Sequence, residues 1–241
     1  MIMRSVKIMA GLSSTVTLAL LALSPVAAMA AGPGTTTSNL TTVSSGYVAD
    51  TTGSAEAASD AEFTVSPGSL TLNQVPNISL GSAGVKSIAT ADTTLPVVSG
   101  TTTGGTGYDG NSSGTLNVSD YRGTHAGWSL SVGMGPFTSG ANTVTDAKLT
   151  LNETAGTLDN TATAAPVSLL LSQGTVTSGW ISNPENLWNA DTNTGEGNNT
   201  ATTATSSSLL ISKQPLISAG TYTATLYWAL DSAPITVKPA S

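Results

Sequence analysis

Two tryptophan side chains, each followed two positions later by a leucine, are the groups in this sequence best suited to binding a ligand. They are Trp128 with Leu130 and Trp228 with Leu230. Because residues i and i+2 of a strand share a face, each tryptophan should point the same way as its leucine. A buried indole removes about 200 Å² of mostly apolar surface from water and needs one acceptor for its N–H. We expect both pairs to lie in the core; the alternative is that one indole is an exposed platform on which a sugar ring stacks.

A second candidate site is the charged pair Asp120 and Arg122, which would share a strand face with Leu116 and Val118. Charges beside core positions are tolerated only when they pair and satisfy their remaining hydrogen bonds. We therefore expect an Asp–Arg pair that fixes the turn before Gly127. In the alternative, the planar guanidinium of Arg122 binds a carboxylate or phosphate of an external polymer.

Catalysis is not expected from the residue types present. His125 is the single histidine, no cysteine occurs, and no Gly-x-Ser-x-Gly elbow precedes a helical segment. Metal sites built on thiolates or on several histidines are therefore excluded. The 14 acidic residues are scattered, with none in an apolar run that would raise its pKa. Residues 191–198 fail the calcium-loop pattern, because Glu196 stands where that loop requires glycine. The sequence predicts no enzyme, no metal site and no cofactor.

The elements that must position these residues are predicted to be strands. Of the 241 residues, 72 are Ser or Thr and 39% are hydrophobic. Thr fits a pleated strand better than a helix, and no stretch shows a 3.6-residue period. The number and spacing of the alternating segments predict an all-β protein with a single antiparallel β-sandwich, either Ig-like or jelly-roll-like. Strands are expected over 62–65, 69–72, 84–88, 96–98, 114–118, 127–133, 147–151, 167–171, 207–212 and 221–230.

The polar stretch 183–206 is expected to be a functional loop or partly disordered, because it is long and rich in Asn, Thr and Gly. Trp180 and Trp188 flank an irregular segment beside it. For these two tryptophans we favour satellite packing under a long loop over presentation to a glycan.

Residues 1–30 have the three parts of a signal peptide. Arg4 and Lys7 form a basic start, an apolar run covers 8–26, and Ala28-Met29-Ala30 is a cleavage site. Residues 31–60, rich in Thr, Ser, Gly and Ala, are expected to be a flexible linker, and residues 61–238 the folded domain. No later segment approaches the ~20 apolar residues needed to cross a bilayer. The mature chain is therefore expected to be secreted, with neither a membrane span nor a covalent anchor.

The charge balance excludes one class of partner. Seven Lys and Arg residues against 14 Asp and Glu residues give a net charge of −7. Removal of Arg4 and Lys7 with the signal peptide would leave five against 14, a net charge of −9. Such a chain lacks the basic surface that nucleic-acid binding requires, and it should be repelled by anionic polymers.

The two Trp-x-Leu pairs lie in longer patterns that resemble the WxL family of cell-surface proteins of Gram-positive bacteria. Residues 116–130, LNVSDYRGTHAGWSL, match the strand, Asp-x-Arg-Gly turn and Gly-Trp-x-Leu strand of the family. The distal pattern, Tyr-x-x-x-Leu-x-Trp-x-Leu-x-x-x-Pro, is matched by Tyr222, Leu226, Trp228, Leu230 and Pro234. The resemblance covers about residues 62–238. His125 and Tyr227 depart from the small residue and the threonine that are usual at these two positions.

The resemblance implies an exported protein that attaches non-covalently to the bacterial cell wall, through peptidoglycan or an associated polymer. In the alternative, the domain is a structural subunit of a surface complex and binds another exported or membrane-anchored protein rather than a glycan. Both alternatives place the mature chain at the cell surface. The candidate binding residues are Asp120, Arg122, Trp128, Leu130, Tyr222, Trp228 and Leu230.

Overall fold

The computed structural model describes residues 60–98, 101–102 and 105–235. By its internal contacts the chain divides into two units, Met1–Thr64 and Val65–Ser241, and every strand and helix described here belongs to the second unit. The predicted signal peptide (1–30) lies outside the described residues, as do the predicted linker (31–60) except for Asp60 and the end of the predicted domain after residue 235.

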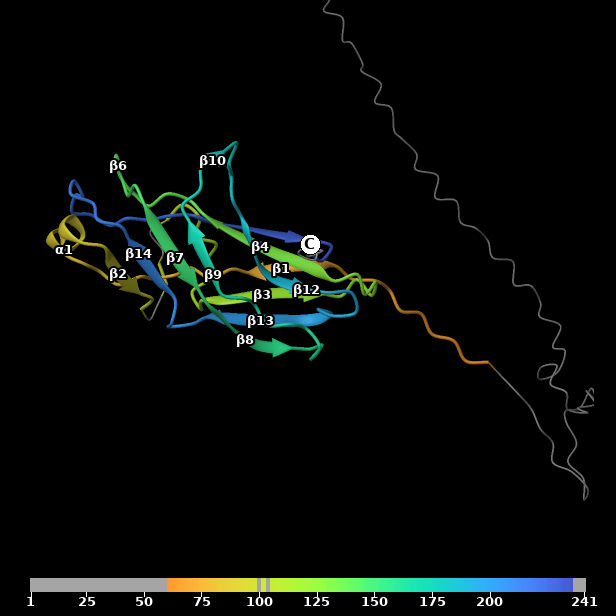
Figure 1. Ribbon diagram of the computed structural model, residues 1–241. Coiled ribbons are helices and arrows are strands. Elements are labelled where there is room, and N and C mark those ends of the chain that lie inside the picture. The colour runs from red at the N-terminus through yellow and green to blue at the C-terminus, as the bar shows by residue number, and fades with distance from the viewer. Residues whose placement is uncertain (1–59, 99–100, 103–104, 236–241) are drawn as a thin grey trace, which may run out of the picture. The chain divides into compact units, whose positions relative to one another are not determined.

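The described domain consists of fifteen strands and one short helix (Figure 1). They are β1 (Leu70–Gln74), α1 (Val85–Thr90), β2 (Thr93–Pro96), β3 (Thr115–Asp120), β4 (Trp128–Met134), β5 (Thr138–Ser139), β6 (Asn142–Thr143), β7 (Ala147–Leu151), β8 (Glu153–Leu158), β9 (Leu169–Ser172), β10 (Val176–Thr177), β11 (Trp180–Ile181), β12 (Glu185–Ala190), β13 (Gly197–Thr203), β14 (Ser208–Ile211) and β15 (Leu226–Asp231). Three sheets have the orders β1-β3-β13-β8, β12-β4-β15 and β2-β14-β7-β9, and two hairpins pair β5 with β6 and β10 with β11.

One apolar core joins the three sheets. Alternation buries Leu116 and Val118 on β3, because a half-buried strand turns every second side chain inward. The central strand β4 is buried along nearly its whole length, since β12 and β15 pair with its two edges. The same core cluster contains side chains of β7, β9, β12, β13 and β14. Antiparallel sheets that share one core form an all-β sandwich, as the sequence predicts.

The segment 84–88, predicted to be a strand, is instead the start of α1. Its apolar residues Val85, Ile88 and Ala89 follow the i, i+3, i+4 spacing of one helical face. The backbone N–H of Ile88 donates to the carbonyl oxygen of Gly84. In the described part of the chain, no helix is long and apolar enough to cross a membrane.

The prediction of a long loop over 183–206 is also wrong, because this stretch contains the whole of β12 and of β13. Polar residues form these strands by bonding to each other and to backbone groups. Asn199 is fully buried, and its amide donates to the carbonyl oxygen of Gly195 at 2.8 Å. Asn198 accepts a hydrogen bond from Asn117 of the neighbouring β3 at 2.7 Å.

Two further strand predictions need correction. Residues 62–65 form no strand, and Phe63 and Val65 are 87% and 79% exposed, so their alternation reflects no packing. The strand expected over 221–230 begins only at Leu226. Before it, Thr223 forms an isolated bridge to Thr138.

Candidate functional site

The two Trp-x-Leu pairs lie on neighbouring antiparallel strands. β15 pairs with β4 so that Leu230 is opposite Leu130 and Trp228 is opposite Val132. Residues almost 100 positions apart therefore form one structural unit in the sheet β12-β4-β15.

Trp128 is enclosed by the protein on every side and is fully buried. Its indole N–H donates to the carbonyl oxygen of Gly195 at 3.0 Å. Its ring meets that of Trp188 edge to face, with centroids 5.2 Å apart. Gly195 has a φ of +82°, and a Cβ at this position would collide with the indole nitrogen. The tryptophan of the proximal motif thus holds the fold together and is closed to any ligand.

The distal pair is less deeply buried. Trp228 and Leu230 are half-buried and pack against the core from the edge strand β15. Trp228 also lines a small cavity of about 50 Å³ together with Pro76, Ile78 and Leu226. This cavity is too small for a sugar ring, since ligand pockets usually measure ~300 Å³ or more.

Asp120 and Arg122 form a tight ion pair that ties the two motifs together. The Arg122 Nε donates to Asp120 Oδ1 at 2.9 Å and its Nη2 donates to Oδ2 at 2.7 Å. The same guanidinium donates to the carbonyl oxygens of Gly127, before the proximal tryptophan, and of Ser232, after the distal leucine. Because Arg122 donates to its carboxyl group, the pKa of Asp120 lies below its ordinary value. With four of its N–H groups engaged inside the domain, Arg122 acts as a brace between the motifs.

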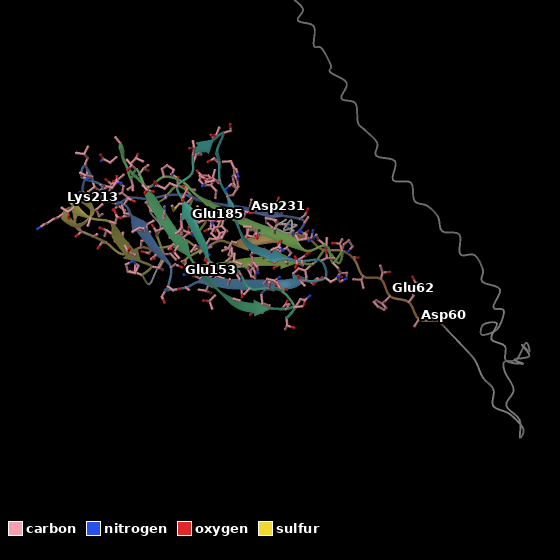
Figure 2. All side chains as sticks on the ribbon, viewed as in Figure 1. Asp60, Glu62, Glu153, Glu185, Lys213 and Asp231 are labelled. Carbon is pink, nitrogen blue, oxygen red and sulfur yellow. The ribbon has the colours of Figure 1, made fainter. Side chains whose placement is uncertain are left out.

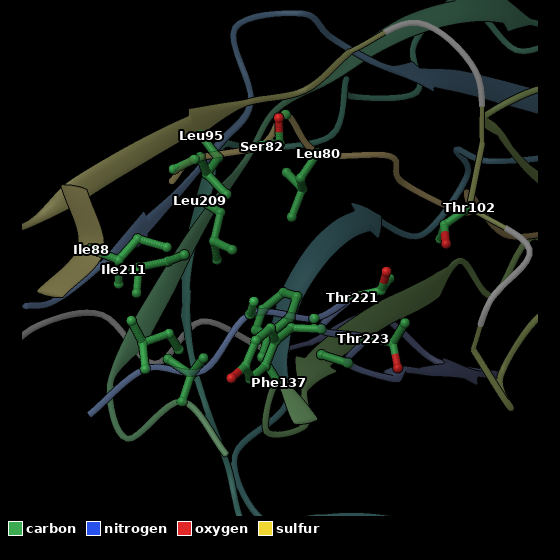
Figure 3. A pocket seen from close by; sticks show the side chains of 18 of the residues that line it. Leu80, Ser82, Ile88, Leu95, Thr102, Phe137, Leu209, Ile211, Thr221 and Thr223 are labelled. Carbon is green, nitrogen blue, oxygen red and sulfur yellow. The ribbon is translucent and has the colours of Figure 1, made fainter. Parts of the chain in front are cut away.

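Tyr222 does not belong to this unit. It lies before β15, and its hydroxyl donates to the carbonyl oxygen of Ser218 at 3.1 Å. Its side chain helps to line a different cavity of about 580 Å³, which Figure 3 shows from close by. Of the seven predicted site residues, the structure therefore brings six together around β4 and β15 and leaves Tyr222 apart.

Trp180 and Tyr227 form an aromatic pair near this unit that is partly open to solvent. Their rings meet edge to face with centroids 5.6 Å apart, and Trp180 is 42% exposed. Trp180 follows the turn of the β10–β11 hairpin, where Ser178 and Gly179 both have positive φ. Gly135 lies beneath the pair, and a Cβ there would approach the Tyr227 ring to 3.3 Å. Trp188, the other tryptophan considered for this role, is fully buried.

The pairing of Trp180 with Tyr227 could not be read from the sequence, because it depends on how the hairpin folds over β15. One signal for it was present. Tyr227 occupies the opposite strand face from Trp228 and stands where the family usually has threonine. An aromatic side chain on the outer face of a sheet usually packs against a neighbouring side chain.

A second polar cluster lies at the turn that carries His125. His125 has a φ of +55°, and its Nδ1 lies 2.9 Å from Glu196 Oε1. Asn160 donates to the other carboxylate oxygen of Glu196, and this hydrogen bond, with the contact to His125, lowers the pKa of Glu196. Within the described ranges, no group of three or more His, Cys, Asp or Glu residues could hold a metal ion.

Glu153 is buried and has a raised pKa, although no acidic residue lies in an apolar run of the sequence. It begins β8 with only 9% of its surface exposed. Burial raises the pKa of this carboxyl to about 7, although a hydrogen bond from Thr203 to Oε1 at 2.7 Å opposes the shift. Its neighbours along the chain, Asn152 and Thr154, are polar, so nothing local signals the burial. The long-range pairing of β8 with β13 produces it.

Comparison with known proteins agrees with this architecture. The family model described as WxL domain surface cell wall-binding matches residues 49–234. No curated protein and no solved structure matches the chain. The match includes both Trp-x-Leu pairs and the Asp120–Arg122 brace, and it indicates attachment to a cell wall at the cell surface. The chain therefore belongs to the WxL domain family of surface cell wall-binding proteins.

Proposed function

We propose that this protein is exported and binds the glycan strands of peptidoglycan through the exposed ring of Trp180, which the half-buried Tyr227 supports. The observation that carries the proposal is the difference in burial among the tryptophans. Trp128 and Trp188 are fully buried and their indole N–H groups are already bonded inside the protein. Trp180 is 42% exposed and has an aromatic neighbour that holds its ring in place.

A held aromatic ring suits a sugar ligand. Sugar rings have faces of C–H groups that stack on an aromatic plane, and little conformational entropy is lost when that plane is already fixed. Trp also combines a large apolar face with one polar N–H, so it can contact both the ring face and a hydroxyl. The motif residues support this platform indirectly, because Tyr227 lies on the strand that also carries Trp228 and Leu230.

The test is cosedimentation of the mature protein with purified cell walls. Trp180→Ala should weaken retention at least about tenfold, which corresponds to ~1.4 kcal/mol. Tyr121→Ala is the matched control, since Tyr121 is a single aromatic residue with 57% exposure and has no stacking partner among the described residues. Equal retention of the Trp180→Ala variant and the wild type would refute the proposal, provided that circular dichroism shows both to be folded.

A second candidate function is supported by the position of β15. This strand is at the edge of the sheet β12-β4-β15, and edge strands can accept an additional strand from a partner protein. Under this hypothesis the domain is a structural subunit that binds a membrane-anchored surface protein. The backbone N–H of Leu226, at the start of β15, faces away from β4, because Leu226 lies opposite Met134 next to the hydrogen-bonded pair Thr225 and Gly135. Leu226→Pro would remove this donor from the open edge, so loss of capture by such a partner with wall retention unchanged would favour the second function.

A further inference from the structure

We propose that the cavity of about 580 Å³ bounded by α1, β14 and residues 217–224 is a binding site for a single aliphatic chain that carries an anionic head group. This activity goes beyond wall attachment and uses none of the residues proposed for it. The volume lies in the range typical of small-molecule sites.

The walls of the cavity are apolar side chains from separate parts of the chain. Leu80 and Leu95 line one side, and Leu209 of β14 lies beside them (Figure 3). Phe137 is on the opposite side, in front of the segment that contains Thr221. Phe137 and Leu209 are at most 9% exposed, so the floor of the cavity belongs to the core.

The chemistry of the lining selects the ligand. Among the described residues that line the cavity there is no Asp, Glu, Lys, Arg or His, and the polar groups are hydroxyl and backbone groups. The one phenol, Tyr222, already donates to the carbonyl oxygen of Ser218. A charged or strongly polar group placed inside would lose its hydration without replacement. A chain of methylene groups has no such hydration to lose, and each buried methylene adds favourable free energy of transfer from water.

The charge around the cavity favours an anionic head group. Lys86 follows the lining residue Val85 on α1, and Lys213 comes two positions after the lining residue Ile211. The backbone N–H of Gln214 donates to the carbonyl oxygen of Ile88, which places Lys213 beside α1; Figure 2 labels Lys213 at this end of the domain. Both lysines are exposed. Among the described residues the other arginine or lysine side chains are Lys148 on β7 and Arg122, which is bound to Asp120.

The acidic side chains Asp92 and Asp146 also lie at this end, and each accepts a hydrogen bond from the segment that carries Lys213. Asp92 accepts a hydrogen bond from the backbone of Lys213 at 2.8 Å, and Asp146 accepts one from Ser212 at 2.6 Å. Neither residue forms an ion pair with a lysine within the described ranges. Of the apolar residues that line the cavity, Val85 is 43% exposed, so the lining continues to the surface at α1.

The experiment uses the mature protein and the fluorescent fatty acid dansyl-aminoundecanoic acid. We expect a saturable increase and blue shift of the dansyl emission, reversed by octanoate, decanoate and dodecanoate in rising order of affinity. Each added methylene should strengthen competition roughly threefold to fourfold. No saturable change in emission, or competition that does not depend on chain length, would overturn the proposal.

Two variants test the location and one comparison tests the head group. Ala219→Trp fills the cavity from an exposed lining position and should weaken probe binding at least tenfold, whereas Ala165→Trp, exposed but outside the lining, should not. The double variant Lys86→Glu/Lys213→Glu should weaken dodecanoate several-fold and its methyl ester far less. Equal binding by the Ala219→Trp and Ala165→Trp variants, or an equal response of acid and ester, would contradict the site as proposed.

The source of the chain is distinguished by a vesicle assay. Sedimentation with phosphatidylglycerol vesicles that is lost in Ala219→Trp would assign the chain to a membrane lipid. Binding of free dodecanoate without such sedimentation would assign it to a free amphiphile. Wall retention of Ala219→Trp should be normal, because Trp180 and Tyr227 are not part of the cavity lining. Failure of this proposal is therefore separable from failure of the peptidoglycan proposal.

Discussion

Replacing Glu153 by glutamine should change how the stability of this protein depends on pH. Glu153 is almost completely buried at the start of β8 (Figure 2). Its Oε1 accepts a hydrogen bond from Thr203, while its Oε2 is buried and has no hydrogen-bond partner among the described residues. Ionisation would leave a negative charge out of contact with water. Burial therefore raises the pKa from 4.5 to about 7.

The sign of the effect follows from the order of the two pKa values. Below pH 4.5 the carboxyl is protonated in both the folded and the unfolded chain and costs no stability. As pH rises, the unfolded chain ionises first, so the folded state loses stability until the carboxyl also ionises in the folded state above pH 7. A difference of about 2.5 pKa units corresponds to a loss of roughly 3 kcal/mol between pH 4 and pH 8.

The assay is urea unfolding of the wild type and of Glu153→Gln at these two pH values, followed by tryptophan fluorescence. Glutamine has nearly the same shape, can accept the hydrogen bond from Thr203 and does not ionise. Relative to the wild type, the variant should gain about 3 kcal/mol of unfolding free energy between pH 4 and pH 8. Other titrating groups are common to both proteins and cancel in this difference.

The matched control is Glu185→Gln, because Glu185 is exposed on β12. Its unfolding free energy should follow that of the wild type at both pH values. If the difference between Glu153→Gln and the wild type is the same at pH 4 and at pH 8, then Glu153 is not buried as described and the reasoning is refuted.

Three further predictions concern the brace, the motif tryptophans and the wall. Arg122→Ala should lower the unfolding free energy by roughly 3 kcal/mol, because it leaves Asp120 buried without its partner; a loss under about 0.5 kcal/mol in urea titrations would contradict the brace. Trp128→Phe should cost about 2–4 kcal/mol and Trp228→Phe clearly less, since only Trp128 is fully buried and bonded to Gly195; the reverse order would show that their roles are exchanged. Retention on purified walls should be stronger at pH 4.5 than at pH 7.5, because protonation reduces the net negative charge that repels anionic wall polymers. Equal or weaker retention at the lower pH would exclude that repulsion.

The sequence predicts well the strands whose apolar residues alternate. The expected ranges 114–118, 127–133, 147–151 and 207–212 agree to within one or two residues with β3, β4, β7 and β14. In these segments local pattern and final burial coincide, because each strand turns one apolar face towards the common core. The expected Asp–Arg pair is also present, since Asp120 and Arg122 are close in the chain and their pairing follows from local geometry.

Features that depend on distant contacts escaped prediction. β13 contains no long apolar side chain and is stabilised by Asn198 and Asn199, whose partners come from β3 and from the turn at Gly195. The burial of Glu153 and the edge-to-face contact of Trp180 with Tyr227 likewise require strands that meet only after folding. The six residues of α1 are too few to show a clear helical period, so the sequence pattern predicts a strand there.

Under the proposed function Trp180, and neither motif tryptophan, contacts the wall. NMR spectra of the indole N–H groups during titration with soluble peptidoglycan fragments test it most directly, because the protein has four tryptophans and each gives its own signal. We predict the largest shift for Trp180, with the signals of Trp128 and Trp188 unchanged. A shift of the Trp128 signal with none for Trp180, or no shift of any indole signal, would contradict the account.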